Sequence, residues 1–221
     1  MTTRPRRYDL IAFDWDGTLF DSTALIVRCI QQSCRDIGVP VPDDERASFV
    51  IGLGLHDALQ HAVPGLEAER YPELGLRYRH HYLASQHQIS LFDGTLDMLR
   101  ALKNRHHWLA VATGKSRRGL DEALGTTQMR GLFDASRTAD ETFSKPHPRM
   151  LQELMAEFGV DAERSLMIGD TTHDLQMAGN AGVASVAVSY GAHDAQALED
   201  LEPLFIAGST ADLHNWLLAH A

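Results

Sequence analysis

Short apolar runs, partly β-branched, recur along the chain, and each ends at a polar or glycine-containing turn. Helical patterns such as Arg149–Phe158 and His173–Asn180 lie between the later runs. Strands that alternate with helices are typical of a parallel sheet covered on both faces. Because the predicted strands are too few for a closed eight-stranded barrel, we predict a doubly wound, Rossmann-like α/β sheet. The strand candidates are Asp9–Phe13, Trp108–Thr113, Ser165–Ile168, Ser185–Ser189 and a weaker one, Leu204–Ala207.

One long segment, from residue 21 to residue 89, departs from this alternation. It carries helical patterns but no convincing strand, and it is longer than an ordinary connection between a strand and a helix. We therefore predict that residues 21–89 form an inserted helical domain, while residues 1–20 and 90–221 form the α/β core. The helical patterns of the insertion span Ser22–Ile37, Asp43–Val50, His56–His61 and Glu67–Gln86.

The polar residues that follow the predicted strands are the candidates for function, because ligands in an open α/β sheet bind beyond the carboxyl ends of the strands. Taken singly, each has an ordinary explanation: Asp-Gly is a common turn, and acidic side chains often begin a helix. Their convergence on one edge of the sheet favours a single site instead. The candidates are Asp14, Asp16, Gly17 and Thr18 after the first run, Thr113, Gly114 and Lys115 after the second, Lys145 beside Pro146, and Asp170 and Asp174 in GDTTHD.

Two carboxylates one residue apart, Asp14 and Asp16, raise each other's pKa unless a cation neutralises them. Asp14 and Asp170 can supply the hard oxygen ligands that Mg²⁺ prefers. One carboxylate can then attack phosphorus, while another protonates the leaving oxygen and later activates water. The groups that can hold the phosphoryl oxygens and offset their charge are Thr113, the backbone N–H of Gly114 and Lys145.

These motifs resemble those of the haloacid dehalogenase superfamily, and specifically its phosphoglycolate phosphatase-like branch. The matching residues are DWDGTL at 14–19, Thr113 of ATGK, Lys145 of SKP, and GDTTHD at 169–174. The resemblance implies that Asp14 is the nucleophile and Asp16 the general acid/base. It implies that Mg²⁺ is held by Asp14, the backbone carbonyl of Asp16, and Asp170, with Asp174 supporting the metal site or Lys145. It also implies that the helical insertion is a cap that closes over the site.

Single residues separate the activities within this family. Asp16 argues against dehalogenation, because dehalogenases of the family lack the second carboxylate. The family's phosphonatases use a cap lysine, and residues 21–89 contain no lysine. We therefore expect a Mg²⁺-dependent phosphatase that hydrolyses a small phosphomonoester, similar to phosphoglycolate, through an aspartyl-phosphate intermediate. The alternatives are an inorganic pyrophosphatase, a sugar-phosphate phosphatase or mutase, and a non-catalytic relative that binds a phosphorylated ligand.

The segment VIGLGLHDAL, residues 50–59, is predicted to be a turn between two helices whose apolar tip reaches toward the active site. The uncharged tip disfavours a mutase, which must hold a second phosphate and usually does so with cationic cap residues. His56 in this turn fits an exposed position as well as a contact with substrate. Trp15 is expected to pack beside the end of its strand. Lys115 and Arg117 could assist phosphate binding, but they are interpreted as surface charges at a helix start, and they stay outside the predicted catalytic set.

The composition excludes further classes of function. A formal net charge of −10 argues against a binder of nucleic acid or of anionic membranes, and no apolar run is long enough for a membrane span. The basic start MTTRPRR lacks the apolar stretch of a secretory signal, so we expect a short solvated tail. Cys29 and Cys34 are spaced to share one helix and are expected to be reduced thiols of a cytoplasmic protein. We expect a monomer or weak dimer whose partner is a small phosphorylated metabolite.

Overall fold

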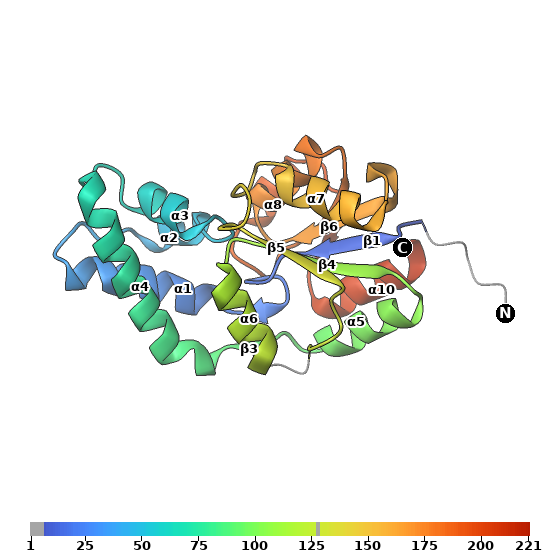
Figure 1. The fold of residues 1–221 in the computed structure, drawn as a ribbon, viewed down its shortest axis with the longest axis horizontal. Helices are drawn as coiled ribbons and strands as arrows, with labels where there is room; N and C mark the ends of the chain where they lie inside the picture. The colour runs from blue at the N-terminus through green and yellow to red at the C-terminus, as the bar shows by residue number, and fades with distance from the viewer. Residues whose placement is uncertain (1–6, 127–128) are drawn as a thin grey trace.

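A six-stranded parallel sheet forms the centre of the computed structural model, which describes residues 7–126 and 129–221 (Figure 1). The strand order is β5-β4-β1-β6-β7-β8, and every neighbouring pair is parallel. The predicted doubly wound α/β fold is therefore confirmed. The strands are β1 (Leu10–Phe13), β4 (Trp108–Thr113), β5 (Ala135–Thr138), β6 (Ser165–Gly169), β7 (Ala184–Val188) and β8 (Ile206–Ala207).

Helices cover both faces of the sheet. Successive strand residues point to opposite faces, so apolar side chains project from both and need to be covered. The covering helices are α5 (Thr95–Asn104), α6 (Arg117–Thr126), α7 (Arg149–Phe158), α8 (Thr172–Asn180), α9 (Ala195–Glu199) and α10 (Thr210–His220). Figure 1 shows α7 and α8 above the sheet and α5 and α10 below it. On β1, Ile11 and Phe13 belong to the apolar cluster shared with α5 and α10, whereas Leu10 and Ala12 belong to the cluster shared with α7 and α8. The sheet is thus buried on both sides.

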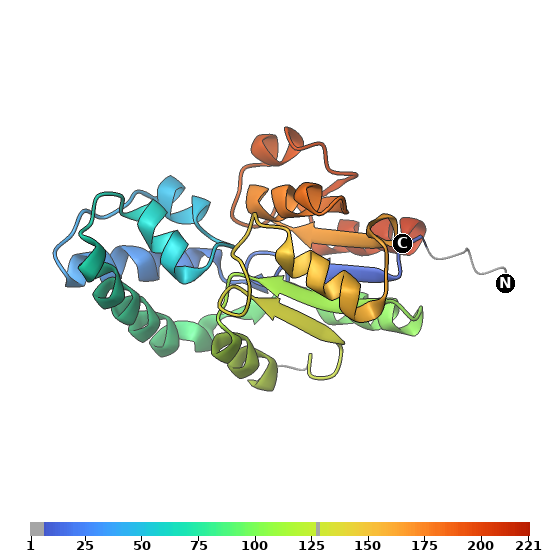
Figure 2. The same ribbon diagram turned by 45° about the horizontal axis from the view of Figure 1, so that its top comes forward.

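The segment between residues 21 and 89 forms helices that lie beyond one end of the sheet (Figures 1 and 2). They pack around an apolar cluster of their own, which includes Ile30, Leu59 and Leu74. The chain enters and leaves through a short antiparallel ribbon, in which β2 (Phe20–Asp21) pairs with β3 (Ser90–Leu91). The helices are α1 (Thr23–Asp36), α2 (Asp44–Phe49), α3 (Leu55–Ala62) and α4 (Tyr71–Ser85), and single 3-10 turns span Ala68–Arg70, Gln86–Gln88 and, elsewhere, Ala162–Arg164.

Several smaller expectations can be compared with the structure. Strand β5 was absent from the predicted set, because its sequence ASRT is mostly polar and only half-buried. Cys29 and Cys34 both lie buried on α1 as free thiols, as expected. No helix in the described part of the chain has both the length and the apolarity to cross a membrane. Residues 1–6 of the basic tail lie outside the described residues.

Candidate active site

Three neighbouring strands carry the first polar residues of the site. β1 lies between β4 and β6, so the residues at their carboxyl ends meet at one edge of the sheet. Asp14 directly follows β1, Thr113 is the last residue of β4, and Asp170 directly follows β6. All three are at most 1% exposed. The topology of the sheet therefore brings together residues that lie far apart in the sequence.

A cluster of three acidic side chains occupies this edge. Carboxylate oxygens of Asp14, Asp170 and Asp174 lie within 4.8 Å of one another, and all three side chains are buried. Burial raises the pKa of Asp14 well above its ordinary value and that of Asp170 to about 7. Oδ2 of Asp14 is buried without a hydrogen-bond partner among the described residues. A hard divalent metal ion fits this set of oxygens, because it would neutralise the cluster and give the orphaned oxygen a partner.

Asp170 is held by its surroundings on both oxygens. The Thr18 hydroxyl donates to Oδ1 at 2.8 Å, and the backbone N–H of Ala192 donates to Oδ2 at 2.8 Å. Gly17, with a φ of +82°, passes so close that a Cβ there would lie 2.1 Å from Oδ2 of Asp170. Glycine is therefore required at position 17, both because of the positive φ and because a side chain would collide with the Asp170 carboxylate.

Lys145 supplies the positive charge at the base of the site. Its Nζ donates to Oδ1 of Asp14 at 2.6 Å and forms an ion pair with Oδ1 of Asp174, also at 2.6 Å. Burial by itself lowers the pKa of a lysine, but the attraction of the two carboxylates outweighs it, and the pKa of Lys145 is raised. Asp174 is fixed in turn at the start of α8, where it forms a capping box with Thr171.

Asp16 is not one of the three clustered acids and has different partners. The Ser22 hydroxyl donates to its Oδ1 at 2.8 Å, and Lys115 Nζ lies 2.9 Å from its Oδ2. Lys115 also donates to the hydroxyl of Tyr82, on α4, at 2.7 Å. The interpretation of Lys115 as a surface charge is therefore wrong: its side chain is 11% exposed and directed into the site. A signal was available in the sequence, because Lys115 follows Thr113 by only two residues and the chain has few lysines.

Arg117 lies at the start of α6 and pairs with acidic residues at the surface, as predicted from its position at a helix start. Its guanidinium pairs with Glu141 at 2.6 Å and with Asp121 at 3.3 Å on α6. Trp15 is also as expected: it is 2% exposed and stacks on Phe20, with ring centroids 4.7 Å apart. Both residues lie outside the set that surrounds the acidic cluster.

The turn before α3 presses against the residue that follows Thr113. A Cβ on Gly114 would lie 2.3 Å from the carbonyl oxygen of Leu53, so this position requires glycine. The next residue of the turn, Gly54, donates its N–H to the Ser144 hydroxyl at 2.8 Å. The prediction that the apolar tip of residues 50–59 reaches the active site is confirmed.

A second contact joins the inserted helices to the sheet. The carbonyl oxygen of Phe49, at the end of α2, accepts hydrogen bonds from Nε2 of His173 at 2.7 Å and of His193 at 3.0 Å. The Phe49 ring stacks on His193 and meets His173 edge-on. The sequence gives no local sign of this contact, because its three residues come from distant segments.

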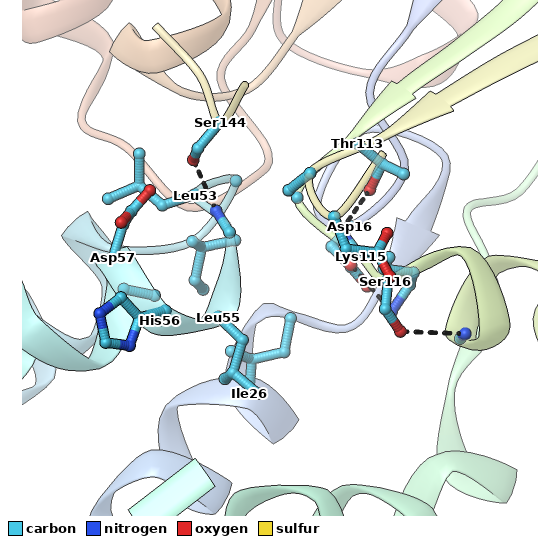
Figure 3. A pocket seen from close by; sticks show the side chains of 18 of the residues that line it. Asp16, Ile26, Leu53, Leu55, His56, Asp57, Thr113, Lys115, Ser116 and Ser144 are labelled. Carbon is cyan, nitrogen blue, oxygen red and sulfur yellow. Dashed lines mark hydrogen bonds and ion pairs between the residues drawn. The ribbon is translucent and has the colours of Figure 1, made fainter. Parts of the chain in front are cut away.

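A pocket of about 880 Å³ lies between the inserted helices and the strand ends. Asp16, Thr113 and Lys115 lie on one side of it, and Leu55 and His56 lie on the other (Figure 3). His56 is exposed and meets the ring of Tyr71 edge-on at 6.0 Å. Lys145 and Asp174 lie behind the pocket, fully buried. The arrangement offers a buried carboxylate within an acidic cluster that fits a cation, opening into a cavity large enough for an organic ligand.

Comparison with known proteins agrees with this geometry. The family model described as haloacid dehalogenase-like hydrolase matches residues 11–188. A phosphoglycolate phosphatase of Aliivibrio fischeri is 34% identical over 220 residues, covering 95% of this chain and 95% of its own. A probable phosphatase, IndB, of Dickeya dadantii is 35% identical and covers 92% of this chain and 91% of its own.

Solved structures agree as well. The crystal structure of a predicted phosphoglycolate phosphatase from Haemophilus somnus superposes with a TM-score of 0.85 at 26% identity. The match covers 96% of this chain and 99% of that chain. The resemblance inferred from the four motifs is thus confirmed. The chain belongs to the haloacid dehalogenase-like hydrolase family and is a phosphoric monoester hydrolase.

Proposed function

We propose that this enzyme is a Mg²⁺-dependent phosphatase that hydrolyses a small phosphomonoester through an aspartyl-phosphate intermediate. The observation that carries the proposal is the state of Asp14, whose Oδ2 is buried without a partner while Oδ1 accepts from Lys145. An unpartnered buried oxygen is costly to keep in a folded protein, so it indicates a group held ready for a ligand. The residues around Asp14 could bind both groups: the Asp170 carboxylate could bind a cation, and the Lys145 ammonium group could bind a phosphoryl group.

The metal would be held by Asp14, Asp170 and the backbone carbonyl of Asp16, with Asp174 supporting Lys145 behind them. The buried oxygens of the acidic cluster support this assignment, because Mg²⁺ prefers carboxylate and carbonyl ligands. When bound, Mg²⁺ would offset the charge of the carboxylates and of the phosphoryl oxygens.

The reaction then divides between two carboxylates. Asp14 attacks phosphorus, the bond from phosphorus to the leaving oxygen breaks, and Asp16 gives its proton to that oxygen. Asp16 next takes a proton from a water molecule as this water attacks the phosphorus of the aspartyl phosphate. Inorganic phosphate leaves, and the Asp14 carboxylate is restored. Both side chains line the pocket, but Asp16 is 8% exposed and Asp14 only 1%, so Asp16 is the more accessible group for exchanging a proton with the leaving oxygen and with water.

Three further groups would hold the phosphoryl oxygens during both steps. The Thr113 hydroxyl, at the end of β4, and the backbone N–H of Gly114, directly after it, line the same pocket as Asp14 and can donate to these oxygens. Lys145 lies 2.6 Å from Asp14 and offsets the charge that gathers there. All three are placed by secondary structure or by buried ion pairs, which limits their movement.

We further propose that residues 21–89 act as a cap on a core formed by residues 1–20 and 90–221. The close approach of Leu53 to Gly114 and the hydrogen bond from Gly54 to Ser144 support a closed arrangement over the pocket. The leaving group of the substrate would then lie between the cap and Asp16. Access would require the cap to move away from the core.

The contact at Gly114 gives a direct test of the cap. Gly114→Ala would force a shift of the Leu53 carbonyl or of the strand end, since overpacking of this kind costs about 1–3 kcal/mol. We expect kcat/KM for phosphomonoesters to fall by about 5- to 150-fold, the factors that correspond to 1–3 kcal/mol. The matched control is Gly125→Ala on α6, where a Cβ would meet nothing within 4 Å. Equal kinetics for the two variants would contradict a closed cap during turnover.

The substrate we propose is a small phosphorylated metabolite similar to phosphoglycolate, as the phosphoglycolate phosphatases among the relatives suggest. Inorganic pyrophosphate and sugar phosphates are the alternatives, and a pyrophosphatase PpaX of Oceanobacillus iheyensis is 28% identical over 205 residues. We also propose a cytoplasmic monomer or weak dimer. A screen of phosphorylated metabolites with the purified protein, ranked by kcat/KM, decides among these substrates.

The experiment that tests the reaction itself is hydrolysis of a generic aryl phosphate. We expect turnover with Mg²⁺, loss of turnover after chelation, and recovery when Mg²⁺ is restored. A non-catalytic relative would bind phosphate without releasing phenol. Metal-replete, folded protein without any turnover of aryl or alkyl phosphates would overturn the proposed function.

A further inference from the structure

Lys115 is a buried cation for which the proposed reaction has no use. It lies between the end of β4 and the start of α6, and its side chain is 11% exposed. Removing an ammonium group from water is costly unless an anion lies close to it. Here the anion is Asp16, with Oδ2 at 2.9 Å from Nζ, and the Tyr82 hydroxyl completes the contact at 2.7 Å.

Turnover requires Asp16 to exchange one of these contacts. Both of its oxygens are occupied in this structure, Oδ1 by the Ser22 hydroxyl and Oδ2 by Lys115. A proton donor must come within about 2.6–3.2 Å of the oxygen that it protonates. Asp16 can pivot about its bond to Ser22 and reach the leaving oxygen, but only if Oδ2 leaves Lys115. Lys115 then needs another anion.

We infer that this anion belongs to the substrate: Lys115 and the Tyr82 hydroxyl bind a carboxylate on the leaving group, close to the ester oxygen. Asp16 occupies the position of that carboxylate in this structure. The inference rests on the proposed function and specifies the chemistry of its leaving group. Binding of the substrate carboxylate to Lys115 releases Asp16, which can then reach the leaving oxygen. A substrate with this carboxylate therefore places the proton donor for its own hydrolysis.

The charges around the pocket favour a single carboxylate over a second phosphate. Arg118 also lines the pocket, but its side chain is 86% exposed and pairs with Glu122. Arg79 is exposed as well. Besides Asp14 and Asp16, three acidic residues line the same cavity and would repel a doubly charged group; they are Asp57, Glu122 and Asp140. One buried ammonium group matches one negative charge.

Tyr82 connects this subsite to the inserted helices. Its hydroxyl accepts from Lys115, and its ring lies beneath the ammonium group, with Nζ 4.6 Å from the ring centroid. The hydroxyl can donate its own proton to a carboxylate oxygen. The ring of Tyr78 stacks on Tyr82 at 5.9 Å and limits its movement. The subsite is therefore complete only while α4 lies against the core.

The test compares two substrates that differ in charge but hardly in shape, 2-phosphoglycolate and 2-phosphoglycolamide. For the wild type we expect kcat/KM to favour the acid by about 10- to 100-fold, the value of a hydrogen bond to a charged group. Lys115→Met should bring this ratio close to one, and Lys115→Arg should restore part of it. Because both substrates are measured on the same variant, the ratio is independent of the fraction of folded protein.

Two further variants make the test specific. Arg118→Met removes a positive charge from the rim and should leave the ratio unchanged. Tyr82→Phe should lower the ratio by about 3- to 10-fold, the value of a neutral hydrogen bond, and serves if Lys115→Met does not fold. A wild-type ratio near one, or a ratio that Lys115→Met and Tyr82→Phe leave intact, would overturn the inference while the phosphatase function stands.

Pyrophosphate provides the third arm of the test. A wild type that prefers pyrophosphate to 2-phosphoglycolate, and loses that preference in Lys115→Met, would assign the subsite to a second phosphate and refute the carboxylate. Failure to hydrolyse any phosphomonoester would refute the proposed function, and this inference with it.

Discussion

Asp14→Asn is expected to lower phosphate release by at least about 10⁴-fold, the order of loss seen when the nucleophile of a covalent enzyme is removed. The amide oxygen can still accept from Lys145, which lies 2.6 Å from Oδ1 in this structure, so the replacement keeps the shape of the site. It removes the negative charge, and with it the ability to attack phosphorus. Initial rates on an aryl and an alkyl phosphate, at saturating Mg²⁺, measure the loss.

The control separates loss of the nucleophile from loss of the fold. Asp21→Asn makes the same chemical change at an exposed carboxylate in β2 and should leave both activity and Tm unaltered. Fluoride complexes of beryllium should inhibit the wild type by mimicking a phosphoryl group on Asp14. Substantial hydrolysis by pure, metal-replete Asp14→Asn would contradict the assignment of the nucleophile.

The core of the fold could be predicted from sequence because its strands are continuous apolar runs. Four strands are covered on both faces of the parallel sheet: β1, β4, β6 and β7. Strands of this kind are nearly continuous apolar runs, which can be identified in the sequence without an alternating polar pattern. β5 could not be found in this way, because an edge strand keeps half of its surface in contact with solvent and tolerates a polar sequence such as ASRT.

Some residues of the site could likewise be predicted from their own stretch of sequence, whereas others depend on contacts with distant segments. Asp14, Thr113 and Asp170 could be placed together because parallel strands share one carboxyl edge. The environment of Lys115 could not be predicted from its neighbours in sequence, because a lysine before a helix is usually solvated. Its actual environment depends on Tyr82, which lies 33 residues away on a helix of the insertion. No local pattern reports such a contact.

Asp16→Asn is expected to distinguish the roles of the two carboxylates of the first motif, Asp14 and Asp16. Asparagine preserves the contacts of Asp16, because its amide can accept from Lys115 and donate to Ser22. It can neither give a proton to the leaving oxygen nor take one from water. General acid/base assistance is worth about 10²–10⁴ in rate, so turnover of alkyl phosphates, whose leaving groups are poor, should fall by roughly that factor.

Aryl phosphates should respond differently, because a good leaving group needs little protonation. Their first step should be nearly preserved in Asp16→Asn, while the second step still lacks its base. Phosphorylated Asp14 should therefore accumulate, and rapid mixing should show a burst of phenol, up to one equivalent per site, before slow turnover. Intact mass spectrometry after acid quench should detect the phosphorylated chain. If the first step fell equally for alkyl and aryl phosphates and no burst preceded turnover, Asp16 would have no acid/base role, and the proton would have to pass through another group beside the leaving oxygen.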